Sequence, residues 1–209
     1  MVRSFVKSLA SPKRWIRRYK RRRRLKKMAN QNPCRIVVGA SGIVPDGWAG
    51  SEVEDLNLLN PDQWSEYFRP DSVDSIVAEH VWEHLTLLDG FNAALTCYQY
   101  LRPYGYLRVA VPDGWHPDPD YVDAVKPGGT GAGSDDHQVL YNHKSLAEIF
   151  AAVGFEILPL EYFDEQGRFQ YSLWDPDDGM IRRSRRFDWR NTDGELNYTS
   201  VIIDAVKVA

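Results

Sequence analysis

The chain has 209 residues, of which 43% are hydrophobic and 12% aromatic, and these proportions suit one domain with a full hydrophobic core. No run reaches the roughly 18 apolar residues of a membrane-spanning helix, and the apolar stretch of a secretory signal is missing. Two widely spaced cysteines, Cys34 and Cys97, exclude a disulfide scaffold, and the formal net charge of −3 conceals a very uneven distribution.

Positive charge is concentrated at the N-terminus. Residues 1–27 hold 13 lysines and arginines and no acid, so the rest of the chain carries 13 basic against 29 acidic residues, a net charge of −16. The sequence therefore predicts a basic amphipathic arm over residues 1–31 and a domain over residues 32–209. The few, unpaired cysteines add the expectation of a reduced, cytoplasmic protein.

Aromatic and aliphatic residues are interleaved with the basic residues of this arm. If residues 12–28 form a helix, Trp15, Ile16 and Tyr19 share one face while arginines cover the rest. This pattern is typical of a helix lying on an anionic membrane surface, and we expect residues 1–28 to attach the protein to the inner face of a membrane. A nucleic-acid-binding arm and a solvated tail without a specific partner are the alternatives.

After the arm, short apolar runs typical of strands alternate with longer runs of helical spacing. This order predicts an α/β, Rossmann-like fold, with a mostly parallel sheet of about seven strands and helices on both faces. The last two strands have no helix between them, so we expect an antiparallel C-terminal hairpin at the sheet edge. Strands are predicted at residues 35–38, 51–59, 73–78, 104–113, 155–163 and 197–208, and helices at 81–101 and 145–154.

Ligands of such sheets bind at the carboxyl ends of the strands. The first strand runs into the glycine turn "GASG" at residues 39–42, where backbone amides can approach a ligand, although an ordinary strand-to-helix turn explains it equally well. The next loop offers Glu52, Glu54 and Asp55 at the distance where a carboxylate can bind both hydroxyls of a ribose.

The stretch "AEHVWEHL", residues 78–85, contains the H-x-x-E-H pattern of zinc hydrolases. That pattern requires a continuous helix and a third protein ligand. Here "VDSIVA" places His80 where a strand meets a helix, and no residue downstream stands out as a third ligand. We therefore predict no metal, and a zinc-dependent hydrolase is an alternative.

Together, "VVGASG", the acid after the second strand, "AEHVWEHL" and "LRPYGYL" resemble the class I S-adenosylmethionine-dependent methyltransferases, in particular a small-molecule branch similar to methyltransferase type 11. The resemblance covers about residues 34–209 and implies S-adenosyl-L-methionine as the cofactor. Ala40 and Ser41 replace the family's second glycine, and Glu52 replaces its commoner aspartate. A catalytically inactive binding module with this fold is therefore a further alternative.

The resemblance also implies roles for individual residues. The glycine loop would wrap the methionine and ribose, an acid would bind the ribose hydroxyls, a polar and an apolar side chain would meet the adenine, and the motif would border the transferred methyl. The loop residues are Gly39, Ala40, Ser41 and Gly42, and the acid for the ribose is Glu52. The residues for the adenine are Asn57 and Leu58, and those beside the methyl group are Glu79 and His80. Glu83 and His84 are expected to form local hydrogen bonds.

The methyl acceptor is expected over the long polar segment 113–146. A histidine suits removal of a hydroxyl proton near neutral pH. The candidates are His137, oriented by Asp136 or Asp113, and His116; capping of turns is the alternative for all four. Trp115, Tyr121 and Tyr141 offer flat faces for sugar rings, so we expect O-methylation of a small-molecule or glycan hydroxyl. Segment 164–198 either covers this site or forms a dimer contact.

Overall fold

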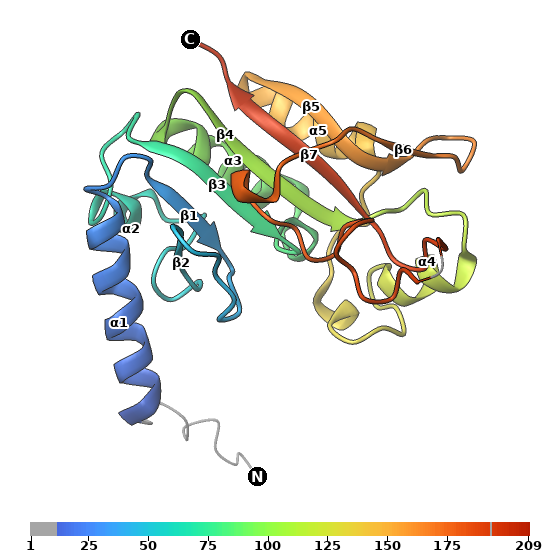
Figure 1. Ribbon diagram of the computed structural model, residues 1–209, viewed down its shortest axis with the longest axis horizontal. Coiled ribbons are helices and arrows are strands. Elements are labelled where there is room, and N and C mark those ends of the chain that lie inside the picture. Colours follow the sequence, from blue (N-terminus) through green and yellow to red (C-terminus); the bar gives the residue numbers. More distant parts are fainter. Residues whose placement is uncertain (1–11, 193) are drawn as a thin grey trace.

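The computed structural model describes residues 12–192 and 194–209. The part of the basic arm before Pro12 lies outside the described residues. Seven strands form one sheet in the order β2-β1-β3-β4-β7-β5-β6, as Figure 1 shows. The elements are α1 Pro12–Met28, β1 Arg35–Val38, β2 Ala49–Gly50, α2 Pro61–Ser65, β3 Val73–Glu79, α3 Leu87–Tyr100, β4 Leu101–Pro112, α4 Pro119–Val125, α5 His143–Val153, β5 Phe155–Phe163, β6 Phe169–Tyr171 and β7 Ser200–Lys207, with 3₁₀ turns η1 Trp82–His84, η2 Ser134–Asp136 and η3 Pro176–Asp178.

The predicted α/β, Rossmann-like architecture with seven strands is confirmed. The strands β2, β1, β3 and β4 pair in parallel, whereas β7 pairs antiparallel with both β4 and β5. The predicted position of the last strand at the sheet edge was wrong, because β7 lies inside the sheet and β6 forms the edge. The composition of β7 explains this position: Val201 and Ile203 are buried on one face and Ile202 on the other, as in an interior strand.

Two predicted elements differ from the structure. The second strand is Ala49–Gly50, and residues 51–59 turn instead, with the N–H of Asp55 and Leu56 bonded to the carbonyl of Glu52. The predicted helix 81–101 is interrupted before Thr86, whose side chain caps α3 by accepting a hydrogen bond from the Asp89 N–H. The result is a short 3₁₀ turn after β3 that carries the second half of the H-x-x-E-H motif.

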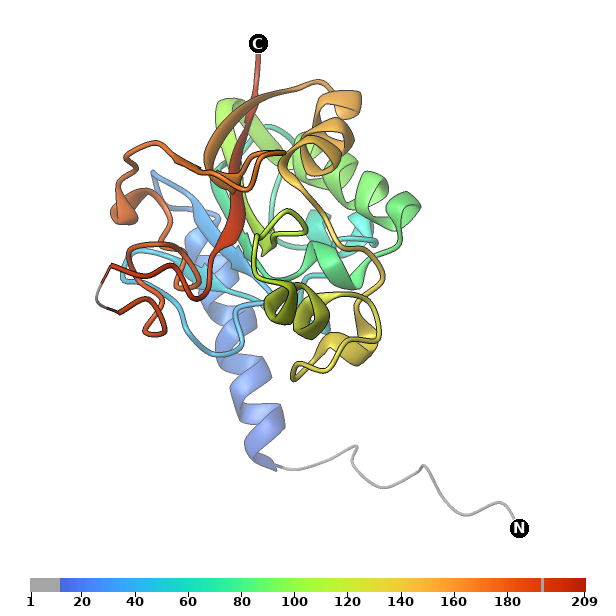
Figure 2. The same cartoon turned by 90° about the vertical axis from the view of Figure 1, so that its right-hand side faces the viewer.

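The two faces of the sheet are covered differently. Helices α2, α3 and α5 pack on one face around a core that contains Trp64, Trp82 and Phe150. The other face was also predicted to carry helices, but an irregular segment within residues 172–190 covers it, with Ile181 buried against the strands. Figure 2 shows α3 and α5 on one side of the sheet and this orange-to-red segment on the other. The segment therefore runs close to the site described below.

Helix α1 packs along β2 at the edge of the sheet (Figure 1). Leu25 enters the core, and Arg18 and Arg21 form ion pairs with the buried carboxylate of Asp55. This excludes an unstructured tail for residues 12–28 and confirms the predicted helix there. In the part of the chain that the structure describes, no helix is long and apolar enough to cross a membrane.

Candidate functional site at the carboxyl edge of the sheet

The carboxyl ends of β1, β2 and β3 lie side by side, because these strands are parallel neighbours in the sheet. The segments that follow them begin at Gly39, Ser51 and His80. The fold thus brings together Gly39, Glu52 and His80, which are remote in sequence, at one edge of the sheet, where ligands of open α/β sheets bind.

The loop after β1 has open backbone amides. Gly39 has a left-handed backbone with φ +61°, and a Cβ there would lie 2.7 Å from Cγ2 of Val81. The N–H of Ala40 donates to the Ser51 carbonyl at 3.0 Å and ties the loop to the chain leaving β2. Among residues 12–192 and 194–209, the N–H groups of Ser41 and Gly42 have no hydrogen-bond acceptor. These two amides are free to bind a polar ligand group.

Of the three acids after β2, only Glu52 is free. Asp55 and Glu54 are paired with Arg21, and Arg18 also contacts Asp55. The half-buried carboxylate of Glu52 makes no ion pair or hydrogen bond within the described ranges. An unpaired carboxylate at a strand end suits a ligand with paired hydroxyls.

The carboxylate of Glu79 is already bound by the chain. It accepts hydrogen bonds from the N–H groups of Arg182, at 3.2 Å, and Arg183, at 2.9 Å, and both guanidinium groups lie within ion-pair distance. Glu79 therefore fastens the irregular segment to the end of β3. Glu79 still lines the smaller pocket, and its carboxylate has a lone pair left for one further donor.

His80 is the first residue after β3 and has a left-handed backbone with φ +55°. Its Nε2 lies 3.1 Å from the hydroxyl of Ser200, which donates its own proton to the Arg183 carbonyl. His80 Nε2 must therefore donate to Ser200 Oγ. This bond fixes the imidazole at the edge of the sheet.

Two pockets adjoin at Glu79 and His80. The smaller, of about 230 Å³, lies between the Gly39–Pro45 loop and Met180, and Glu79 lines it. The larger, of about 620 Å³, is lined by His80, and Arg182 borders both pockets. Ligand pockets commonly measure about 300–1,000 Å³, so a cofactor of nucleoside size would need to extend beyond the smaller one.

Several aromatic residues of the larger pocket were missed in the sequence. They belong to segment 164–198, and its dense "FDWRN" cluster was the available signal. Arg190 stacks on Tyr198 with its guanidinium carbon 3.3 Å from the ring centroid, and Trp189 is 82% exposed. Residues of segment 164–198 therefore line the larger pocket, in agreement with the interpretation that this segment lies over the site. The aromatic residues of this pocket are Phe187, Trp189 and Tyr198.

The predicted catalytic residues are only partly brought together. His137 lines the larger pocket, and its Nδ1 lies 2.7 Å from the Val125 carbonyl. Asp136 instead lies beside His84, with 2.9 Å between Oδ1 and Nδ1. His116 is buried, stacked on Tyr121 with 4.0 Å between ring centroids, and lines neither pocket.

Asp113 is buried and joins two segments of the chain. Its carboxylate accepts hydrogen bonds from the N–H groups of Phe163 at 2.7 Å and Trp115 at 2.9 Å. Asp113 therefore neither reaches the pockets nor orients His137. The predicted stacking of sugars on Tyr121 and Tyr141 was also wrong, because both rings are at most 5% exposed.

Burial raises the pKa of Asp113 to about 6, although the N–H groups of Phe163 and Trp115 favour the ionised form. The folded protein then holds a proton that the unfolded chain releases near pH 4, so this contribution to stability is present at low pH and lost as the pH rises to about 6. The loss amounts to about 3 kcal/mol. A carboxyl ¹³C NMR titration should show a midpoint near 6 that Asp113→Asn removes. A midpoint below about 4.5 would contradict the burial argument.

The two residues predicted for the adenine have structural contacts. Asn57 accepts a hydrogen bond from the N–H of Leu59 at 2.9 Å, and its carbonyl accepts one from the Trp64 indole at 3.0 Å. Leu58 is buried in the core beside α2. Neither residue lines either pocket.

The H-x-x-E-H motif does not form the helix of a zinc hydrolase. His80 directly follows a strand, and residues 82–84 form one 3₁₀ turn, so the two histidines do not share one face of an α-helix. Nδ1 of His80 lies 3.0 Å from the Glu83 carboxylate, while the His84 ring packs against His137 with 4.8 Å between centroids. The zinc-hydrolase alternative is therefore excluded in the form that the sequence suggested.

The fold defines an α/β, Rossmann-like protein, and its carboxyl edge carries a candidate ligand site with two pockets. No protein-family model matches the chain, and no curated protein does. Its fold is similar to an S-adenosylmethionine-dependent methyltransferase from Archaeoglobus fulgidus, with 13% identity, 93% of this chain and 94% of that chain covered, and a TM-score of 0.48. It is also similar to one from Thermotoga maritima, with 13% identity, 93% and 97% covered, and a TM-score of 0.47.

Proposed function

We propose that the protein is an S-adenosyl-L-methionine-dependent methyltransferase that O-methylates a small-molecule or glycan hydroxyl. The meeting of two pockets at Glu79 and His80 carries this proposal, because methyl transfer requires a cofactor and an acceptor to approach in line. The smaller pocket adjoins the glycine loop, and the larger one is open to an acceptor. His80 stands where the methyl group would pass.

The residues at the carboxyl edge fit the parts of this cofactor. The free amides of Ser41 and Gly42 suit its carboxylate and ribose oxygens, and the unpaired carboxylate of Glu52 suits the two ribose hydroxyls. None of these three residues lines either pocket, so the cofactor would reach them only by extending beyond the smaller one. When bound, the cofactor supplies an electrophilic methyl group. The protein then has to orient the acceptor and receive its hydroxyl proton.

The larger pocket suits an acceptor with flat apolar faces and hydroxyl groups. Phe187, Trp189 and Tyr198 provide rings on one wall, and His137 lines the pocket from the loop before α5. Because Nδ1 of His137 faces a carbonyl and so carries the proton, the lone pair lies on Nε2, which can accept the hydroxyl proton. Among the four predicted catalytic residues, we retain His137 for this role.

Calorimetry with S-adenosylhomocysteine tests the cofactor half of the proposal. We expect one site per chain with a dissociation constant of about 1–100 μM. Glu52→Ala should weaken binding about tenfold by removing a charge-assisted hydrogen bond, whereas Glu66→Ala, another surface acid near α1, should not. An acceptor panel then tests the other half, and turnover of phenols or amines without any turnover of glycans would restrict the acceptor to small molecules.

A catalytically inactive binding module is the second candidate, favoured by the bonds that hold Glu79 to Arg182 and Arg183. If this closure persists in solution, the cofactor pocket stays too small for the whole cofactor. Absence of S-adenosylhomocysteine binding at 1:1 stoichiometry would support the module and contradict the methyltransferase.

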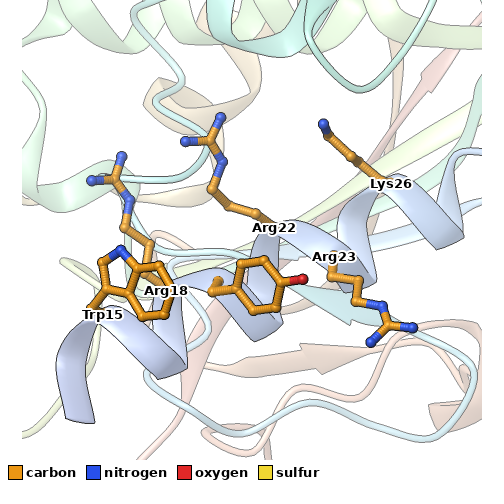
Figure 3. Close-up of a pocket in the computed structure, with 6 residues that line it drawn as sticks. Trp15, Arg18, Arg22, Arg23 and Lys26 are labelled. Carbon is orange, nitrogen blue, oxygen red and sulfur yellow. The ribbon is translucent and has the colours of Figure 1, made fainter. Parts of the chain in front are cut away.

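We also propose that α1 attaches the protein to an anionic membrane surface. Arg18, Arg21 and Arg22 pair with acids of the domain, and beside them Trp15, 68% exposed, stacks on Tyr19, 55% exposed. Figure 3 shows Arg18 next to Trp15, with Arg22, Arg23 and Lys26 farther along the helix. Of these cations, Arg23 and Lys26 make no ion pair within the described residues. Aromatic rings in the headgroup layer and cations on anionic lipid are the two contacts of an interfacial helix. On this proposal, the protein is cytoplasmic and peripheral.

Vesicle flotation tests this attachment. The protein should float with phosphatidylglycerol vesicles and not with phosphatidylcholine vesicles, and about 0.5 M salt should release it. Trp15→Ala with Tyr19→Ala should lower partitioning about tenfold, whereas Trp189→Ala, another exposed tryptophan, should not. Tighter binding to an oligonucleotide than to the anionic vesicles would replace the membrane with nucleic acid as the partner.

A further inference from the structure

Three potential metal ligands meet beside the larger pocket. One ligand atom each from Glu83, His84 and His137 lies within 4.8 Å of the other two. The histidine rings are nearly perpendicular, at 78°, and His137 lines the larger pocket. The cluster joins the 3₁₀ turn after β3 to the loop before α5, and Gln138 N–H donates to the Glu83 carbonyl at 2.7 Å across the same junction.

The cluster contains buried polar atoms without partners. Glu83 is 1% exposed, yet neither of its carboxylate oxygens has an aligned hydrogen bond within the described ranges, and neither does Nδ1 of His84. His80 and Asp136 stand near these atoms, at 3.0 and 2.9 Å, without that alignment. A buried carboxylate left without a hydrogen bond or counterion is strongly unfavourable. His80 can serve as a counterion for one oxygen of Glu83, whereas the second oxygen has no partner within the described ranges, and a bound cation would satisfy it.

His137 is oriented as a ligand. Metal-binding histidines usually donate the other ring N–H to a carbonyl or a carboxylate, which fixes the tautomer. Nδ1 of His137 lies 2.7 Å from the Val125 carbonyl, so its Nε2 carries the free lone pair. The carboxylate of Asp136 stands 2.9 Å from Nδ1 of His84 but is not aligned as a hydrogen-bond acceptor, so His84 lacks such an orienting bond.

We propose that Glu83, His84 and His137 bind a divalent transition-metal ion, with zinc the preferred occupant. Two imidazoles and one carboxylate form a known three-ligand set for zinc that leaves a fourth position for water or substrate. This site differs from a helical H-x-x-E-H site, because His137 takes the place of His80 and Glu83 is itself a ligand instead of the residue that activates water. The ion would neutralise the buried carboxylate and lie at the wall of the larger pocket.

Metal binding itself does not rest on the proposed methyl transfer. If that function holds, the bound ion would occupy Nε2 of His137, and the acceptor hydroxyl, acidified by coordination to the ion, would release its proton to water instead of to the imidazole. Loss of activity in a His137 variant fits both roles. The decisive measurement is therefore metal binding by the full chain without a cofactor.

The test uses tag-free protein stripped with a chelator and titrated with Co²⁺, followed by visible absorption, and with Zn²⁺, followed by calorimetry. We expect one ion per chain with a dissociation constant of about 1 μM or tighter. Glu83→Gln, His84→Ala and His137→Ala should each weaken binding about 100-fold. His143→Ala is the matched control, because His143 packs on Tyr162 outside the cluster and its loss should leave binding unchanged.

Circular dichroism in the presence of chelator checks that each variant is folded. If Glu83→Gln unfolds the protein, metal binding by His137→Ala tests the site instead, because His137 lies on the wall of the pocket. Absence of binding in the wild-type protein, or equal binding in the His84 and His137 variants, would overturn the proposal. Calorimetry with S-adenosylhomocysteine in the presence of chelator distinguishes the metal site from the methyltransferase function. Cofactor binding without metal binding rejects only the metal site. Metal binding without cofactor binding rejects only the methyltransferase function.

Discussion

Replacing Arg108 with alanine is expected to lower the free energy of unfolding by about 3–5 kcal/mol, because it leaves a largely buried aspartate without its counterion. The Arg108 side chain on β4 is 4% exposed and binds both carboxylate oxygens of Asp204 on β7, at 2.7 and 2.8 Å. It also donates to the carbonyl of Gly179 at 2.7 Å and so fastens the irregular segment to the sheet. Urea denaturation measures the effect.

Arg168→Ala is the matched control, because Arg168 pairs with Asp164 while 69% exposed, and its loss should cost less than about 1 kcal/mol. The double variant Arg108→Leu with Asp204→Leu should recover part of the stability, since no charge is then left unpaired. Equal effects of Arg108→Ala and Arg168→Ala would show that the buried pair contributes no more than a surface pair.

Gly39→Ala is expected to weaken S-adenosylhomocysteine binding about 100-fold, if the loop after β1 holds the cofactor. The substitution places a Cβ 2.7 Å from Cγ2 of Val81, so the loop must shift and the amides of Ser41 and Gly42 move with it. Each lost hydrogen bond to a charged group costs about 1.5–3 kcal/mol, or about a tenfold or greater loss of affinity. Calorimetry measures the change.

Gly47→Ala separates this displacement from backbone strain. Gly47 has the same left-handed backbone, with φ +79°, but a Cβ there meets no atom within 4 Å. The variant should lose about 1–2 kcal/mol of stability and keep its affinity within about twofold. Similar affinities of the Gly39 and Gly47 variants would place the cofactor away from the glycine loop.

Local sequence patterns determined most of the fold. Alternating apolar runs predicted β1, β3, β4, β5 and β7, and the glycine at 154 correctly marked the end of α5. The same patterns placed His80 at the end of a strand, which argued against a helical zinc site before the structure did. Parallel pairing then brings Gly39, Glu52 and His80 to one edge, because strands that run in the same direction end on the same side.

Contacts between remote segments were decided only by the tertiary structure. Asp113, His116 and Tyr121 have the polar groups of a site, but their burial is set by packing against Phe163 and the chain around Tyr198. Local periodicity identifies the apolar face of a helix or strand, but it does not identify the segment that packs on this face. The periodicity of the sequence therefore could not predict that residues 172–190 cover the second face of the sheet.

The charges show the same division. The sequence determined that the N-terminal residues are basic and the domain acidic, but only the fold shows that Arg18 and Arg21 meet Asp55 while Trp15 and Tyr19 remain exposed. Likewise, the motif supplied Glu83 and His84, and the fold added His137 from more than 50 residues away. An ion pair or a ligand set requires proximity in space, and spacing along a chain determines proximity only within one element.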